Sequence, residues 1–190
     1  MIRHLFQTLR LLGISLLAGA TWVAYRPADL PKVAAPSNAK ADDLLDSLRQ
    51  TTIKRAAVVE ISEAEINRHL ATTLSGKIPS MLGSWVAFEG ARVDLEPDRA
   101  RLFVIWKLKG YTHTASVDLA ISRDDKNFRV EVLRGAYGHL QMPRGMMRPL
   151  YPSLEALAEA LDPEIRALFQ MTQITIAKDK LVLDPRFPPA

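Results

Sequence analysis

Hydrophobic and polar positions divide the chain into three parts. Residues 1–25 contain one long apolar run, residues 26–40 are rich in proline and alanine, and residues 41–190 mix helical and alternating periodicities. The pattern therefore predicts a signal anchor or transmembrane helix over 1–25, a linker over 26–40 and an extracytoplasmic domain over 41–190.

The N-terminal run is long enough to cross a bilayer. Leu5 to Tyr25 are 21 residues that include a single charge, Arg10, and as a helix they span about 31 Å. Trp22 and Tyr25 lie where interfacial aromatics are common. Arg3 and Arg10 precede the run, which favours an N-in, single-pass protein of the cytoplasmic (inner) membrane with a periplasmic domain.

A cleaved signal peptide is the alternative interpretation of the same run. The basic start, the apolar middle and Ala18-Gly19-Ala20 all suit it. We favour the anchor, because cleavage after Ala20 would leave Trp22, Val23 and Tyr25 as an apolar stub. Both interpretations send the domain across the membrane. The linker that follows is expected to be semi-extended and to pack little.

Helical and strand patterns then alternate. Residues 41–50 predict a short helix and 53–61 a strand. Ser62 and Glu65 have the spacing of a capping box, and they start a helix that ends before Gly76. Its apolar stripe, formed by Ile66, Leu70 and Leu74, is expected to be buried.

Four segments predict an antiparallel meander, in which residues 100–108 are apolar on both faces and suit a central or strongly curved strand. The strands are expected over residues 85–95, 100–108, 111–122 and 128–138, with a bulge near Gly90 where the alternation changes phase.

Three prolines over 139–152 are expected to interrupt the meander before a helical region over 154–169. Asp162-Pro163 predicts a break in that region, and 173–177 with 180–184 predict a closing hairpin. The fold class is therefore α+β: a transmembrane helix followed by a curved antiparallel meander that wraps around amphipathic helices. A cystatin-like helix-plus-meander domain is the alternative.

Composition excludes several function classes. The chain has no cysteine, which excludes disulfides, thiol nucleophiles and thiolate metal sites. Of the 25 basic residues, three precede the first acidic one, so residues 27–190 carry 22 basic and 21 acidic groups. A nucleic-acid partner is therefore not expected, because such proteins need a basic face.

No catalytic or metal-binding motif is found. The four histidines lack partners at metal spacing, and His69 is interpreted as a solvated pair with Glu65 one helical turn away. Nucleophile-elbow, phosphate-loop and dinucleotide motifs are missing as well. We expect no enzyme, no catalytic residues, no metal and no cofactor.

An apolar groove is the remaining candidate site. Inward positions of the strands and the methionine-rich segment are expected to line it, and two arginines are expected to meet lipid head groups. The apolar lining is Val104, Trp106, Leu108, Val117, Leu119, Ile121, Val130, Val132, Met146, Met147 and Leu150, and the head-group residues are Arg144 and Arg148. An ordinary filled core is the alternative for the same residues.

Two motifs carry a family resemblance. Val59 to Leu70 include the run Ser-Glu-Ala-Glu-Ile-Asn-Arg-His-Leu, and Gly138 to Pro143 read Gly-His-Leu-Gln-Met-Pro. With the order of elements over residues 41–184, the chain resembles membrane-anchored bacterial proteins of the tubular lipid-binding (TULIP) superfamily, such as the YpmS-like and mannan-maturation lipoprotein-like families. Gln141-Met142-Pro143 departs from the more regular leucine–proline turn of that family.

The resemblance implies lipid binding or a role in envelope assembly, without catalytic residues. Two functions therefore stay open. The first is a lipid-binding or lipid-handling module whose partner is membrane lipid. The second is a non-catalytic structural or interaction subunit that binds another envelope protein.

Overall fold

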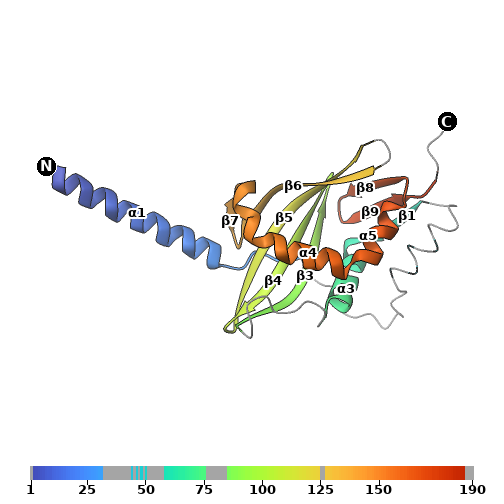
Figure 1. Cartoon of the computed structure of the whole chain (residues 1–190), viewed down its shortest axis with the longest axis horizontal. Coiled ribbons are helices and arrows are strands. Elements are labelled where there is room, and N and C mark those ends of the chain that lie inside the picture. The colour runs from blue at the N-terminus through green and yellow to red at the C-terminus, as the bar shows by residue number, and fades with distance from the viewer. Residues whose placement is uncertain are drawn as a thin grey trace.

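The computed structural model describes residues 2–31, 44, 46, 48, 50, 58–75, 85–124 and 127–186. Helix α1 (Ile2–Tyr25) projects from one end of an α+β domain, and helix α4 (Tyr151–Ala160) lies across one face of a curved sheet (Figure 1). The predicted fold class is thus confirmed at the level of an N-terminal apolar helix followed by antiparallel sheets and helices.

The larger sheet has five strands in the order β3-β4-β5-β6-β7, all antiparallel. Their bounds are β3 Val86–Glu96, β4 Arg99–Leu108, β5 Tyr111–Asp124, β6 Asn127–Tyr137 and β7 Leu140–Met142. The register shifts between Phe88 and Gly90, which confirms the predicted bulge. The β4–β5 turn has positive φ at Lys109 (49°) and Gly110 (88°), the backbone of a tight type I′ hairpin.

The segment after β6 holds more structure than its prolines predicted. Strand β7 extends the sheet, a 3₁₀ helix η1 (Arg144–Leu150) follows Pro143, and α4 then starts at Tyr151, earlier than the expected residue 154. Helix α5 (Asp162–Phe169) is separated from α4 at Leu161, so the break at Asp162-Pro163 is confirmed. Proline is tolerated there because the first turn of a helix has no partner for its N–H.

The smaller sheet has three strands in the order β1-β9-β8. The predicted closing hairpin of β8 (Gln173–Ala177) and β9 (Lys180–Asp184) is confirmed. Strand β1 (Val59–Ser62), which comes early in the domain, pairs with β9 near its end. Residues 53–57 of the expected first strand lie outside the described residues. The described positions 44, 46, 48 and 50 are helical, in agreement with the helix expected over 41–50.

Helix α3 (Glu63–Thr73) begins at the predicted capping box. The Ser62 hydroxyl accepts from the Glu65 backbone, and Glu65 in turn accepts from the Ser62 N–H at 2.8 Å. Leu70 and Leu74 of the predicted stripe are buried, and Ile66 packs on the same apolar cluster.

Two apolar clusters hold the fold together. One fills the space between the five-stranded sheet and helices α3, η1 and α4; the other joins the three-stranded sheet to α5. Their buried members are Leu70, Leu74, Ala91, Val104, Ala115, Val117, Met147, Leu150 and Leu157 in the first, and Leu48, Ile61, Leu95, Ala167, Met171, Ile176, Leu181 and Leu183 in the second.

Polar side chains of α3 connect the two sheets along the edge of β3. Asn67 is fully buried; it donates to the Val93 carbonyl and accepts from the Val93 N–H, both at 2.7 Å. Glu63 accepts from the Leu95 N–H at 2.8 Å, and the Asp179 N–H in the β8–β9 turn donates to the Leu95 carbonyl. The edge strand is therefore closed by a helix and a turn.

The chain after α1 lies against the larger sheet. The His139 N–H donates to the Val23 carbonyl, and the Ala28 N–H donates to the Thr114 hydroxyl at 2.8 Å. Arg92 donates to the carbonyl of Pro31 at 2.8 Å. The expectation that the linker packs little is therefore wrong for residues 26–31, because unpaired polar groups of the sheet bind its backbone. Residues 32–40 lie outside the described part of the chain.

Candidate functional site

The predicted apolar lining divides into a closed part and an open part. Val104, Val117, Met147 and Leu150 are at most 1% exposed and pack in one cluster, and Trp106, Leu119 and Val132 pack against it. Ile121 instead packs against the second cluster. Leu108, Val130 and Met146 are exposed, at 37%, 46% and 60%. The structure therefore brings only some of the predicted residues together.

Met147 occupies the position where the sheet has no side chain. A Cβ at Gly135 of β6 would collide with the end of the Met147 side chain, so the two residues fit only because Gly135 lacks one. The thioether chain has three rotatable bonds and adapts to its surroundings. Met147, which closes this part of the interior, therefore has a side chain that can change its conformation readily.

An uncovered apolar strip lies further along β6. Val130 pairs with Ile121 across β5 and β6, so both side chains share one face of the sheet. Phe169 of α5 stacks on Phe128 at 5.8 Å between ring centroids and is 44% exposed. Large apolar side chains are therefore accessible where the sheet meets α5.

Two buried polar atoms on the same face lack a hydrogen-bond partner within the described residues. They are His113 Nε2 on β5 and Tyr137 Oη on β6. Ala115 pairs with Tyr137, and His113 lies two residues before Ala115, so both side chains project from one face beside η1. Burial raises the pKa of Tyr137, which keeps the phenol as a hydrogen-bond donor.

These two residues were not predicted as site residues. Alternation from Tyr111 places His113 on the inward face, and its polar tip in an otherwise apolar row was the available signal. Alternation from Val132 would place Tyr137 outward, and it faces inward only because the β5–β6 register shifts opposite Asp118 and Leu119. The ring of Tyr25, at the end of α1, packs at 85° to the His113 ring, with 4.8 Å between the centroids. The two unpaired atoms consequently lie at the end of the sheet nearest the N-terminal helix.

The predicted head-group residues lie on η1. Arg148 is exposed. The side chain of Arg144 lies outside the described residues, although its backbone starts η1. Both positions are on the segment that carries Met146 and Met147.

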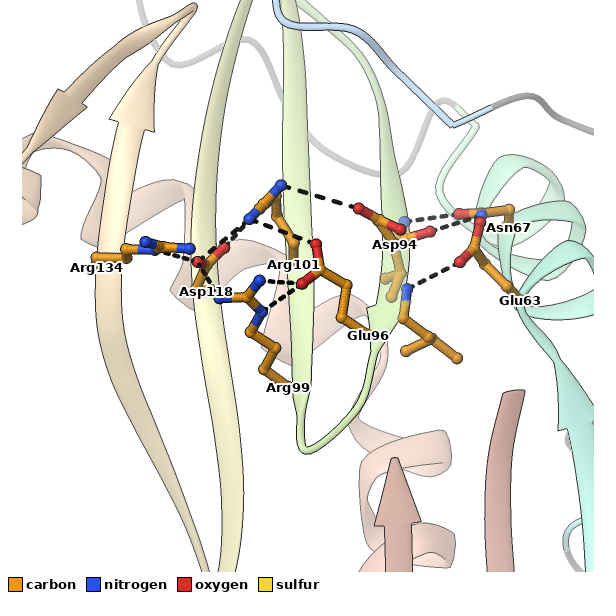
Figure 2. A network of polar contacts seen from close by, with 10 residues as sticks. Glu63, Asn67, Asp94, Glu96, Arg99, Arg101, Asp118 and Arg134 are labelled. Carbon is orange, nitrogen blue, oxygen red and sulfur yellow. Dashed lines mark hydrogen bonds and ion pairs between the residues drawn. The ribbon is translucent and has the colours of Figure 1, made fainter. Parts of the chain in front are cut away.

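The opposite face of the sheet holds a charged network that the sequence did not predict (Figure 2). Asp118 of β5 is 3% exposed and accepts from Arg101 of β4 at 2.7 Å and from Arg134 of β6 at 2.5 Å. Arg99 lies 4.0 Å from the same carboxylate, and Glu96 pairs with Arg99. Alternation predicted only that Asp118 faces away from the helices.

The arginines set the charge of Asp118. Burial by itself raises the pKa of this carboxyl, but the hydrogen bonds from Arg101 and Arg134 outweigh burial and hold the pKa below its ordinary value. Burial has the larger effect at Glu63, where the pKa is raised despite the bond from Leu95. Asp118 is therefore ionised at neutral pH and places one negative charge between its two main partners.

A polar pocket of about 240 Å³ lies on this outer face, beneath the segment that leaves α1. Its walls include Asp29, Arg101, Asp118, Arg134, His139 and Gln141. Because its arginines are already paired with Asp118, the pocket is polar without being strongly cationic. It is suited to a hydrogen-bonding partner.

His69 has a different partner from the one its spacing suggested. Its Nε2 lies 2.9 Å from Glu164 of α5 and 3.2 Å from the Thr73 hydroxyl, so the predicted solvated pair with Glu65 is wrong. Both contacts involve the same ring nitrogen, whereas a nucleophilic triad uses the two nitrogens for different partners. Among the described residues, no group of three His, Asp or Glu side chains is placed to hold a metal.

Helix α1 provides the membrane-related feature of the chain. Within the described residues it is the one helix that is long and apolar enough to cross a bilayer, over Phe6–Tyr25, and this segment is not buried by the rest of the chain. Such a helix can be a membrane anchor or a signal sequence. Comparison with known proteins found no family model and no curated protein that matches this chain.

Proposed function

We propose that this protein is a single-pass, membrane-anchored module of the cell envelope that binds lipid, with α1 in the cytoplasmic membrane and the domain on its outer side. A TULIP-like relationship is part of this proposal. Its support is the resemblance of the two motifs and a curved sheet that wraps an amphipathic helix.

The observation that carries the proposal is the pair of buried, unpaired polar atoms at the α1 end of an apolar face. A buried polar atom without a partner costs about 1–3 kcal/mol. His113 Nε2 and Tyr137 Oη are two such atoms. An ester or head-group oxygen of a lipid would satisfy them, while its acyl chain would lie among apolar side chains that need no hydrogen bonds.

Entry of an acyl chain requires Met147 to move. Its side chain fills the space over Gly135, and η1 carries it at the end of the sheet from which α1 extends. In this proposal a lipid displaces the Met147 side chain and continues toward the open strip at Val130 and Phe169. Arg148 then lies at the mouth, where it can meet an anionic head group.

The test separates binding from folding through Tyr137→Phe. Removal of an unsatisfied buried hydroxyl should leave the empty protein as stable as the wild type or more stable. The same change should reduce the lipid that the full chain retains when native mass spectrometry is performed after mild detergent extraction. Tyr151→Phe is the matched control, because Tyr151 is exposed and begins the adjacent α4.

A second pair of variants tests the apolar strip. Val130→Glu places a charge on the face shared with Ile121, and Leu133→Glu places one at the irregular position between the paired residues Val132 and Arg134. The two side chains are similarly exposed, at 46% and 49%. Loss of retained lipid in the first variant alone supports the proposal; wild-type extracts without lipid contradict it.

An interaction subunit is the second candidate function, and the outer pocket favours it. Four strands, β4 to β7, present polar groups there, and the chain after α1 covers one side of it. A photo-crosslinking residue at Gln141 should then capture one envelope protein in intact membranes. The control position is Glu155, which is exposed on α4 on the opposite face. Equal crosslinking from both positions would contradict this function.

A further inference from the structure

We propose that the β4–β5 turn and the start of β3 rest in the interfacial layer of the bilayer that holds α1. The membrane-seating residues are Trp85, Lys109 and Tyr111. This inference depends on α1 being an anchor, as in the proposed function, and does not depend on lipid binding between the sheet and the helices.

Aromatic contacts connect the end of α1 to this turn. Tyr25, in the last turn of α1, lies 6.0 Å from Tyr111 between ring centroids, and both rings are exposed, at 45% and 62%. Figure 1 shows the turn between β4 and β5 at the end of the sheet from which α1 extends. A bilayer that ends near Tyr25 therefore reaches the level of Tyr111.

Trp85 lies at the same end of the sheet and forms a rim with Lys109 and Tyr111. The Lys109 N–H donates to the Trp85 carbonyl, and the Lys109 ammonium lies 4.5 Å from the centre of the indole ring. Trp85 is 60% exposed although it is one of the largest apolar side chains in the chain. The type I′ turn at Lys109 and Gly110 holds these groups at the tip of a rigid hairpin.

The chemistry of the rim matches the head-group layer of a membrane. Tryptophan and tyrosine concentrate at that depth, because their rings are apolar and their N–H and O–H groups are polar. Lys109 and Arg26 each lie over an indole, Trp85 and Trp22, and so place a cation beside an aromatic ring at two points of one end of the molecule. Cations in this position attract anionic phosphate groups.

Because the rim is continuous with α1, we assign the bilayer, and not a protein, as its partner. The last turn of α1 touches the rim through Tyr25, so the rim and the membrane surface are adjacent in any orientation that leaves α1 across the bilayer. A soluble partner would have to enter this narrow space.

Depth-dependent fluorescence quenching tests the inference on the full chain in phosphatidylcholine–phosphatidylglycerol vesicles. The variant Trp22→Phe with Trp106→Phe leaves Trp85 as the single tryptophan. Its emission should shift to shorter wavelength and be quenched by brominated lipids, most strongly by bromines nearest the head groups. The control adds Trp85→Phe and Arg129→Trp, which moves the tryptophan to an exposed site at the far end of the sheet.

Two results of the quenching experiment would overturn the inference. The first is that acrylamide quenches the Trp85 emission freely and brominated lipids do not quench it. The second is that brominated lipids quench a tryptophan at position 129 as strongly as Trp85. A nitroxide at Tyr111→Cys in the otherwise wild-type, cysteine-free chain gives a second readout, with oxygen expected to reach it better than a water-soluble nickel complex. Recovery of the chain in the soluble fraction after a carbonate wash would instead contradict the anchor itself.

Discussion

Asn67 makes with Val93 the two hydrogen bonds that a neighbouring strand would make. The amide group donates to the carbonyl and accepts from the N–H of the same residue, each at 2.7 Å. One helical side chain thereby continues the ladder of β3 beyond its edge. Because Asn67 is completely buried, the two backbone groups of Val93 lose their partners inside the protein when the side chain is removed.

Asn67→Ala should therefore lower the free energy of unfolding by about 2–5 kcal/mol, since two buried backbone groups lose their partners. Asn67→Asp should be at least as harmful at neutral pH, where the carboxylate faces the Val93 carbonyl. The stability of Asn67→Asp should recover in part at acidic pH, where a protonated carboxyl can donate a hydrogen bond to the Val93 carbonyl. Urea titration of the detergent-solubilised chain measures both.

Thr72→Ala is the control for the Asn67 variants. Thr72 is exposed on the same helix and its hydroxyl bonds only to backbone carbonyls within that helix. A change within about 0.5 kcal/mol is expected for such a position. Equal effects at Thr72 and Asn67 would mean that α3 does not close the edge of β3.

Asp118→Asn tests the charged network on the outer face. We expect a loss of about 1–3 kcal/mol at pH 7; the value stays modest because Arg101 and Arg134 remain 28% and 47% exposed and can be hydrated. Asp94→Asn is the control, because Asp94 is more exposed and lies 3.9 Å from Arg101.

The same residue predicts an acid dependence. The pKa of Asp118 is lower in the folded chain than its ordinary value of 3.8, so its contribution to stability is complete above about pH 4 and declines as pH falls through the folded-state pKa. In acid, the unfolding free energy of the wild type should consequently approach that of Asp118→Asn. A difference in unfolding free energy that stays constant from pH 7 to pH 2 would contradict the assignment.

Gly138→Ala should separate α1 from the sheet. A Cβ at Gly138 would collide with the carbonyl oxygens of Ala24 and Arg26, and φ is +55° there. Spin labels at Thr21→Cys and Gln173→Cys should give a narrow distance distribution in the wild-type background and a broad one with Gly138→Ala. Gly145→Ala, where a Cβ meets nothing within 4 Å, should leave it narrow.

Ser62→Ala should cost about 1 kcal/mol, because the start of α3 loses its cap. The hydrogen bonds from Ser62 also lower the pKa of Glu65, so titration of Glu65 followed by NMR should move toward its ordinary value of 4.5 in this variant. Ser62→Thr keeps a hydroxyl and should preserve both stability and pKa. An unchanged Glu65 pKa in Ser62→Ala would contradict the reciprocal bonding.

Local signals predicted the elements whose causes are local. The Ser62–Glu65 spacing, the change of phase at Gly90 and the Asp162-Pro163 break each depend on residues within one turn or one strand, and all three were confirmed. The Asn67–Val93 and Asp118–Arg134 contacts join residues 26 and 16 positions apart. Their formation depends on the register of the sheet, which no short pattern specifies.

The candidate site was predictable only as an apolar face. Alternation places Val104 and Val117 inward and the structure buries them, but the same pattern fits a filled core and a lined groove equally. The difference depends on Met147 meeting Gly135, a contact between a 3₁₀ helix and a strand. The packing of residues 26–31 was missed for a similar reason, since the partners of Ala28 and Pro31 lie in β5 and β3.

If α1 is the membrane anchor that we propose, the hydrogen bonds that join Thr114 and His139 to the chain around Tyr25 have a consequence for encounters within the membrane. A domain joined to its helix by a flexible linker presents every side to a neighbour in turn. A domain that turns together with its helix presents each side in a fixed direction relative to the membrane plane. Association costs free energy for the rotational freedom that is lost. In the proposed anchored state, these hydrogen bonds between the sheet and the chain around Tyr25 would remove part of that freedom in advance, and the polar pocket would meet a membrane-bound neighbour at one height and tilt.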